Sequence, residues 1–76
     1  MKIKQEFGLV IKELRLQKGI SQERLALDAG IDRTYIGHIE KGVRNVSIEI
    51  IEKLAEYFQI PISEIFKRIE ENEKNI

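Results

Sequence analysis

Two short helical patterns separated by Ala-Gly-Ile-Asp constrain the fold of this chain more than any other feature. They lie in "SQERLALDAGIDRTYIGHIEKG", residues 21–42. Ser21 predicts the N-cap of the first helix and Asp32 that of the second, while Gly30 suits a left-handed turn residue between them. Two helices joined in this way form either a plain helical hairpin or a helix-turn-helix, whose second helix enters the DNA major groove.

Apolar residues at helical spacing predict further helices on both sides of this pair. Phe7, Ile11 and Leu14 recur at i, i+4 and i+7. Ser47 predicts the N-cap of a fourth helix, and Pro61 separates that helix from a fifth, expected from about residue 62. The expected core face of the fourth helix consists of Ile48, Ile51, Leu54, Ala55 and Phe58. The sequence therefore predicts an all-α, compact five-helix domain.

Length and composition limit the chain to a small single domain, residues 1–76. With no cysteine and one histidine, neither disulfides nor a zinc site can support its core. No segment approaches the roughly 18 consecutive apolar residues of a membrane span, and the opening "MKIKQEFG" lacks the apolar run of a signal peptide. We therefore expect a protein of the bacterial cytoplasm without membrane contact.

The net charge of zero conceals an uneven distribution of charged residues. Residues 1–46 contain nine Lys/Arg against six Asp/Glu, whereas residues 47–76 contain four against seven. A basic N-terminal part and an acidic C-terminal part of the chain fit a domain with one face toward DNA. The alternative is random scatter in a chain with 34% charged residues.

The second helix of the pair has a polar face suited to reading bases. A recognition helix contacts base edges with residues near its N-terminus, and arginine is the commonest partner of guanine. Here Arg33 and Thr34 come first, followed one turn later by Gly37 and His38. Glycine inside a helix costs about 0.5–1 kcal/mol relative to alanine. Close approach of the backbone to another surface would justify that cost.

The combination of motifs resembles the lambda-repressor and Cro-like family of helix-turn-helix regulators. The matching stretches, over residues 7–66, are "LR…KGISQERLA", "AGIDRTYIGHIEKG" and "RNVSIEIIEKLAEYF". Within that family, "DRTYI" and "RN" followed by serine resemble the small controller proteins of restriction–modification operons. Such relatives often have Ser then Gly where this chain has Gly37 then His38. The resemblance implies a sequence-specific transcriptional regulator of its own operon that binds a double-stranded DNA operator.

The resemblance also implies roles for individual residues. Arg33, Thr34 and His38 match base-reading positions of the family, and we include Gly37 with them because it would allow close approach of the helix backbone. The positions expected to contact the DNA backbone are Gln22, Tyr35, Lys41, Arg44 and Asn45. Tyr35 could equally lie at the edge of the core. Arg15 and Glu40 match a partly buried structural pair that joins the first helix to the recognition helix.

A homodimer is expected, because one recognition helix reads few base pairs and this fold usually binds paired half-sites one helical turn apart. Surplus apolar residues on the last two helices would form an exposed patch, which is typical of an association surface. We expect the interface on helices at about 47–70. Its expected residues are Ile50, Tyr57, Ile62, Ile65 and Ile69. The alternative is that Ile62 and Ile65 close the bottom of the core.

Patterns typical of catalysis are missing from the sequence. We found no nucleophile–base arrangement, metal-ligand spacing or glycine-rich phosphate loop, so we expect no enzyme, no metal and no cofactor. The length leaves no room for a small-molecule effector domain. Two alternatives remain: an antitoxin-type or phage-type repressor of the same fold, and an adaptor that binds proteins instead of DNA. An adaptor would not need Gln22, Arg33, Thr34 and Arg44 together.

Overall fold

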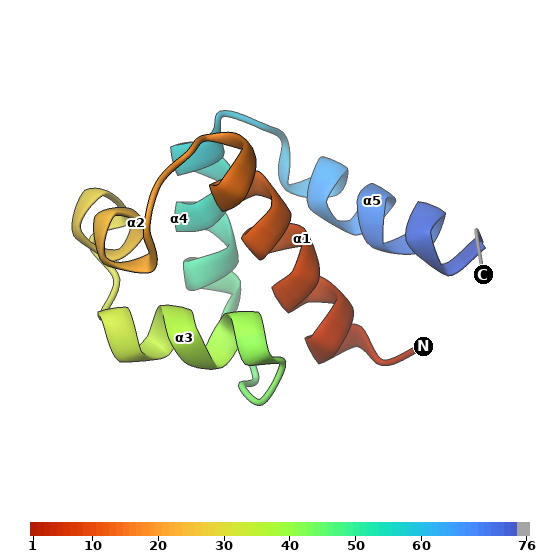
Figure 1. Ribbon diagram of the computed structural model, residues 1–76. Helices are drawn as coiled ribbons and strands as arrows, with labels where there is room; N and C mark the ends of the chain where they lie inside the picture. The colour runs from red at the N-terminus through yellow and green to blue at the C-terminus, as the bar shows by residue number, and fades with distance from the viewer. Residues whose placement is uncertain (75–76) are drawn as a thin grey trace.

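The computed structural model describes residues 1–74, and these form five helices with no strand among them. The helices are α1 (Ile3–Gln17), α2 (Gln22–Ala29), α3 (Arg33–Lys41), α4 (Ile48–Phe58) and α5 (Ile62–Lys74). In Figure 1, α1 crosses the middle of the molecule, α3 lies along its lower edge, and α5 lies on the side of α1 away from α2. The predicted all-α, five-helix fold is confirmed.

Side-chain caps and left-handed glycines set the ends of the central helices. Ser21, Asp32 and Ser47 each accept a backbone N–H from the first turn of the following helix, at 3.0, 2.8 and 3.2 Å. Gly30 ends α2 and Gly42 ends α3, with φ of 69° and 74°, a region that glycine adopts without steric cost. These residues place α2 and α3 where the sequence predicts them.

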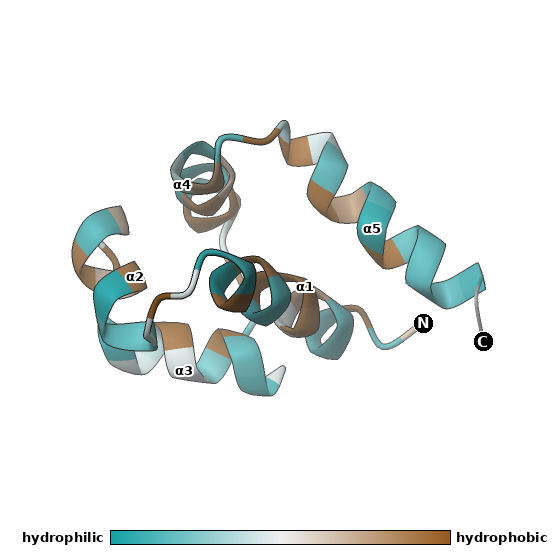
Figure 2. Ribbon diagram, turned by 45° about the horizontal axis from the view of Figure 1, so that its top comes forward, coloured by the Kyte–Doolittle hydropathy of each residue, from teal (hydrophilic) through white to brown (hydrophobic). Residues whose placement is uncertain are grey.

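One apolar core joins the five helices and holds α3 from the inside. The hydrophobic sides of the helices turn toward one another in Figure 2. From α3, Ile36 and Ile39 enter the core, where α3 packs against α1 and α2. The buried core side chains are Phe7, Val10, Ile11, Leu14, Leu25, Ala26, Ile31, Ile36, Ile39, Leu54, Ala55, Ile65 and Ile69. No helix in residues 1–74 has the length and apolar character needed to cross a membrane.

Helix α1 approaches α3 so closely that only glycine fits at the contact. A Cβ atom on Gly8 would overlap the carbonyl oxygen of Ile39 and lie 3.0 Å from that of Glu40. Both neighbouring atoms belong to the backbone of α3, which cannot swing aside as a side chain can. Gly8 therefore fixes the distance between α1 and the end of α3.

The structure corrects part of the expected dimer interface. Ile65 and Ile69 are 0% and 1% exposed, because α5 turns this face onto α1 of the same chain. They therefore belong to the core of one chain and cannot form an exposed patch. Ile62 remains 41% exposed.

Two residues of α4 also differ from expectation. Ile48, expected in the core, is 82% exposed, because it begins α4 one turn before Ile51, where no other helix covers it. Tyr57, expected at the dimer interface, packs within its own chain. Its hydroxyl donates to Asp28 Oδ2 at 2.9 Å, and Lys18 Nζ lies 5.2 Å from its ring centroid. Partial burial and the hydrogen bond to Asp28 raise the pKa of the Tyr57 hydroxyl.

Candidate nucleic-acid interface

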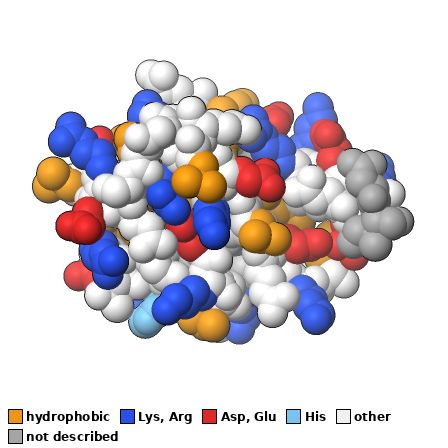
Figure 3. All heavy atoms as spheres, in the orientation of Figure 1, with side chains coloured by type: hydrophobic (Ala, Val, Ile, Leu, Met, Phe, Trp, Pro, Cys, Tyr) orange, Lys and Arg blue, Asp and Glu red, His pale blue; other side chains and the backbone are white. Residues whose placement is uncertain are grey.

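The outer face of α3 presents the residues expected to read bases. Arg33 and Thr34 are exposed at its N-terminus, and Gly37 and His38 are half-buried one turn later. In Figure 3, lysine, arginine and histidine side chains gather along the lower edge of the molecule, over α3 and the loop that follows it. Because Ile36 and Ile39 are buried on the opposite face, the orientation of this polar face toward solvent is fixed by the core.

Gly37 is not required by the packing of the protein itself. A Cβ atom at this position would meet only Gln22 Oε1, at 3.9 Å, which is an ordinary contact distance. The backbone of α3 is therefore accessible from outside at this point. This distinguishes Gly37 from Gly8, where the fold leaves no room for a side chain.

A polar network beneath α3 connects it to α1 and α2. Arg15 Nε and Nη2 donate to the two carboxylate oxygens of Glu40 at 2.8 and 3.0 Å, and Arg15 Nη1 donates to the carbonyl of Ile20 at 2.8 Å. The two side chains are 11% and 3% exposed. The hydrogen bonds that Arg15 donates to Glu40 raise the pKa of the Arg15 guanidinium. This bidentate geometry is the strongest kind of arginine–carboxylate contact.

The network extends to the first residue of α2. Gln22 Nε2 donates to Glu40 Oε1 at 3.1 Å, so one carboxylate holds both Arg15 and Gln22. The amide of Gln22 is thereby fixed at the N-terminus of α2, where a phosphate would also be attracted by the helix dipole. The sequence did not predict this contact, because the spacing of Gln22 and Glu40 follows from the angle between α2 and α3.

The loop after α3, residues 42–47, is held to the helix by one aromatic residue. The Arg44 guanidinium carbon lies 4.5 Å from the centroid of the Tyr35 ring. The Tyr35 hydroxyl donates to the carbonyl of Asn45 at 3.4 Å. Lys41, Arg44 and Asn45 are exposed, which leaves them accessible beside α3. The contact between Tyr35 and Arg44 was also missed, since it depends on the path of the loop.

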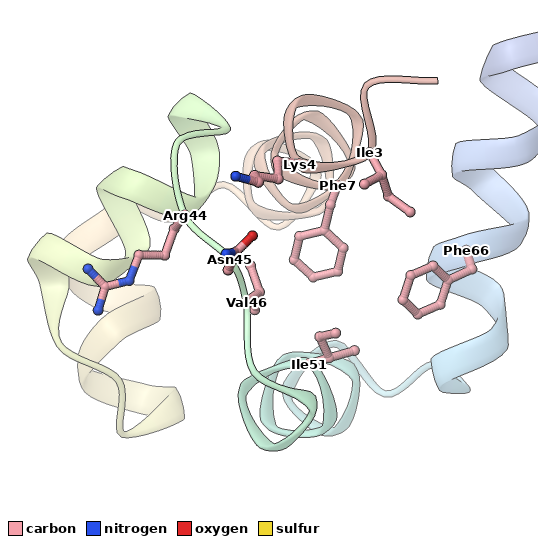
Figure 4. Close-up of a pocket in the computed structure, with 8 residues that line it drawn as sticks. All are labelled: Ile3, Lys4, Phe7, Arg44, Asn45, Val46, Ile51 and Phe66. Atoms are coloured by element: carbon pink, nitrogen blue, oxygen red, sulfur yellow. The ribbon is translucent and has the colours of Figure 1, made fainter.

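Two depressions border this loop on opposite sides. The first, of about 240 Å³, is lined by Asp32, Thr34, Tyr35, His38 and Arg44. The second, of about 220 Å³, is mostly apolar and lies between α1, the loop, α4 and α5. Figure 4 shows Ile3, Phe7, Ile51 and Phe66 converging on it, while the Arg44 side chain extends away toward α3.

The predicted DNA-contacting residues therefore share one side of the molecule. They come from the start of α2, from α3 and from the following loop, which is the arrangement a groove-binding helix needs. No group of three or more metal-ligating side chains occurs among the residues that the structure describes.

The chain is similar to known proteins over most of its length. Residues 11–65 match the family described as Helix-turn-helix. Control protein C.MunI from a Mycoplasma species is 45% identical over 69 residues, which are 90% of this chain and 93% of that protein. The restriction-modification controller protein C.AhdI from Aeromonas hydrophila superposes with a TM-score of 0.80 and 45% identity, covering 86% of this chain and 98% of that one. The controller protein C.Esp1396I, crystallised as a tetramer with its natural 35 base-pair operator, has a TM-score of 0.78 and 34% identity over 88% of each chain.

Proposed function

We propose a restriction–modification controller function for this chain, which belongs to the helix-turn-helix family together with the controller proteins it resembles. Members of this family regulate transcription and are not enzymes, and this chain is a DNA-binding regulator of that kind. In our proposal it binds as a homodimer to paired operator half-sites upstream of restriction–modification genes. No small-molecule effector is needed, because the concentration of the protein sets operator occupancy.

The observation that carries this proposal is the outward polar face of α3, fixed from beneath by the core and by Glu40. Arg33 and Thr34 would read bases at the N-terminal end of α3, and Gly37 would let the helix backbone approach the groove. His38 would contact bases one turn further on. The residues that would contact phosphates are Gln22, Lys41, Arg44 and Asn45. Phosphate contacts set register and affinity, whereas base contacts set sequence preference.

Replacing Arg33 by alanine is expected to weaken sequence preference. If Arg33 pairs with a guanine, its loss costs about 1–3 kcal/mol at that base pair. The difference in affinity between DNA from immediately upstream of the gene and a scrambled duplex of equal length should then decrease. A gel shift at about 150 mM salt measures both affinities.

Arg68→Ala is the matched control for this experiment. It also removes one positive charge, but Arg68 lies on α5, paired with Glu64 at 3.0 Å, away from α3. The control should retain the preference of the wild-type protein for upstream DNA. Equal loss of preference in both variants would contradict base reading by Arg33.

The homodimer would form through an apolar surface that the single chain leaves uncovered. We define the association surface as Ile3, Ile48, Ile51, Ile62 and Phe66. Ile48 and Ile51 are one turn apart on α4, as are Ile62 and Phe66 on α5. Ile51 and Phe66 line the same apolar depression, and Ile48, one turn before Ile51, is strongly exposed. The occupant that we propose is the same surface of a second copy.

The association surface suits a two-fold symmetric dimer, because the surface has both a projecting side chain, Ile48, and an apolar depression. In an isologous dimer each chain would contribute both, so that Ile48 of each copy meets the apolar depression of the other. The depression adjoins the loop after α3. The axis of the dimer would therefore pass near the DNA-facing side, as paired half-sites require.

Replacing Ile48 by glutamate is expected to convert the dimer to a monomer. The change places a charge at the centre of the association surface, while the fold is unaffected because Ile48 lies in solvent in the single chain. Sedimentation at tens of micromolar measures the mass. Leu27→Glu, at an exposed position of α2, is the control and should remain dimeric. A dimeric Ile48→Glu protein would exclude this surface.

A further inference from the structure

We infer that Tyr35 is a positioning residue that holds Arg44 ready for a DNA phosphate, and that it does not itself contact DNA. This inference rests on the proposed function, since it assigns a task within the same interface. The sequence placed Tyr35 among the residues expected to touch the DNA backbone. Its contacts in the structure are made instead to two consecutive residues of the loop after α3.

The first contact orders the side chain of Arg44. The guanidinium carbon lies 4.5 Å from the centroid of the Tyr35 ring, within the range of a cation–π interaction. In the described part of the chain, none of the ion pairs involves Arg44. The aromatic ring therefore supplies the interaction that orients this exposed arginine, and it leaves the charge of Arg44 unneutralised.

The second contact orders the backbone of the loop. The Tyr35 hydroxyl donates to the carbonyl of Asn45 at 3.4 Å. Residues 43–47 belong to no helix or strand, and Val43 N is bonded to the carbonyl of His38 at 3.2 Å. Tyr35 thus holds both the side chain of one loop residue and the main chain of the next.

The surroundings of Arg44 are suited to an anion. The depression that it lines also contains Thr34 and His38, which can donate hydrogen bonds. The carboxylate in this depression, Asp32, is engaged with the backbone N–H of Thr34 at 2.8 Å. An arginine ordered before binding loses less conformational freedom when it meets a phosphate, and this raises affinity.

A double-mutant cycle on DNA binding tests the inference. Tyr35→Leu is expected to weaken binding about 2-fold to 5-fold, which corresponds to an exposed cation–π contact. Tyr35→Phe keeps the ring and should bind within about 2-fold of wild type. In the Arg44→Ala background, Tyr35→Leu should have no further effect, because Tyr35 acts through Arg44. Losses that multiply in the double variant would show that Tyr35 acts independently of Arg44 and would overturn the inference.

A measurement without DNA separates this inference from the proposed function. Protons of the Arg44 side chain should be shifted upfield by the aromatic ring in the wild-type protein and in Tyr35→Phe, but not in Tyr35→Leu. Absence of this shift in the folded wild-type protein would refute the contact while leaving the regulatory function intact. If the shift is present but the wild-type protein binds upstream and scrambled DNA equally, the proposed sequence-specific regulation is wrong, whereas the contact between Tyr35 and Arg44 is confirmed. The double-mutant cycle on scrambled DNA then shows whether Tyr35 acts through Arg44.

Discussion

Glu40→Ala should strongly destabilise the protein. The substitution removes the carboxylate partner of Arg15. The Arg15 side chain is 11% exposed, and its remaining hydrogen bond is to the carbonyl of Ile20. Breaking a fully buried pair costs about 3–5 kcal/mol, and for this part-buried pair we expect a large part of that loss. The core of a domain of this size rarely supplies more than about 3–5 kcal/mol of stability, so the expected loss is a large fraction of it. Urea unfolding followed by circular dichroism measures the loss.

The double variant Arg15→Met with Glu40→Leu is the control, because it tests whether the unpaired charge of Arg15 causes the loss of stability. Replacing both charges by apolar side chains of similar size removes the stranded charge, and such exchanges are often nearly neutral. We expect the double variant to be more stable than Glu40→Ala. If Glu40→Ala unfolds within about 1 kcal/mol of wild type, the pair lies in a more solvated site than its burial indicates.

Replacing Gly8 by alanine is the other substitution with a large expected effect. The new Cβ would overlap the carbonyl oxygen of Ile39 and approach that of Glu40 at 3.0 Å, so α1 and α3 must move apart. Overpacking of this kind costs about 1–3 kcal/mol and occasionally more. Since each kcal/mol lowers the unfolding temperature of a small domain by about 4–8 °C, a thermal melt detects it readily.

Gly37→Ala is the matched control, since it makes the same chemical change inside a helix that has room for it. It should stabilise the protein by about 0.5–1 kcal/mol through helix propensity. In our proposal it weakens DNA binding nonetheless, because the added methyl group faces the groove. Equal stability of Gly8→Ala and Gly37→Ala would refute the close contact between α1 and α3.

Local signals sufficed to predict the helices. Ser21, Asp32 and Ser47 act within one turn of their own positions, and Gly30 needs only its own backbone conformation. Each of these signals can be evaluated without knowing where the rest of the chain lies. For that reason the predicted order and approximate bounds of the helices agree with the structure.

Long-range signals were harder to interpret. Ile48 and Ile65 are equally apolar, but only the packing of α5 on α1 decides that Ile65 is covered and Ile48 is not. The contact between Tyr35 and Arg44 depends on a loop with no regular structure. Gly8 gave no signal at all, because a glycine in an amphipathic helix does not reveal the backbone that will approach it.

The fixed position of α3 against the core limits how regulators of this kind can change their operator preference. Gly8, Glu40 and the buried Ile36 and Ile39 hold the inner side of this helix. A change in its tilt would therefore disrupt the fold. In our proposal, new operator preferences would then arise by exchange of the outward side chains, at Arg33, Thr34, Gly37 and His38. Because these four positions contribute little to the core, a lineage could replace one set by another while retaining the same scaffold. Duplicated copies could thereby acquire separate target sites with few substitutions.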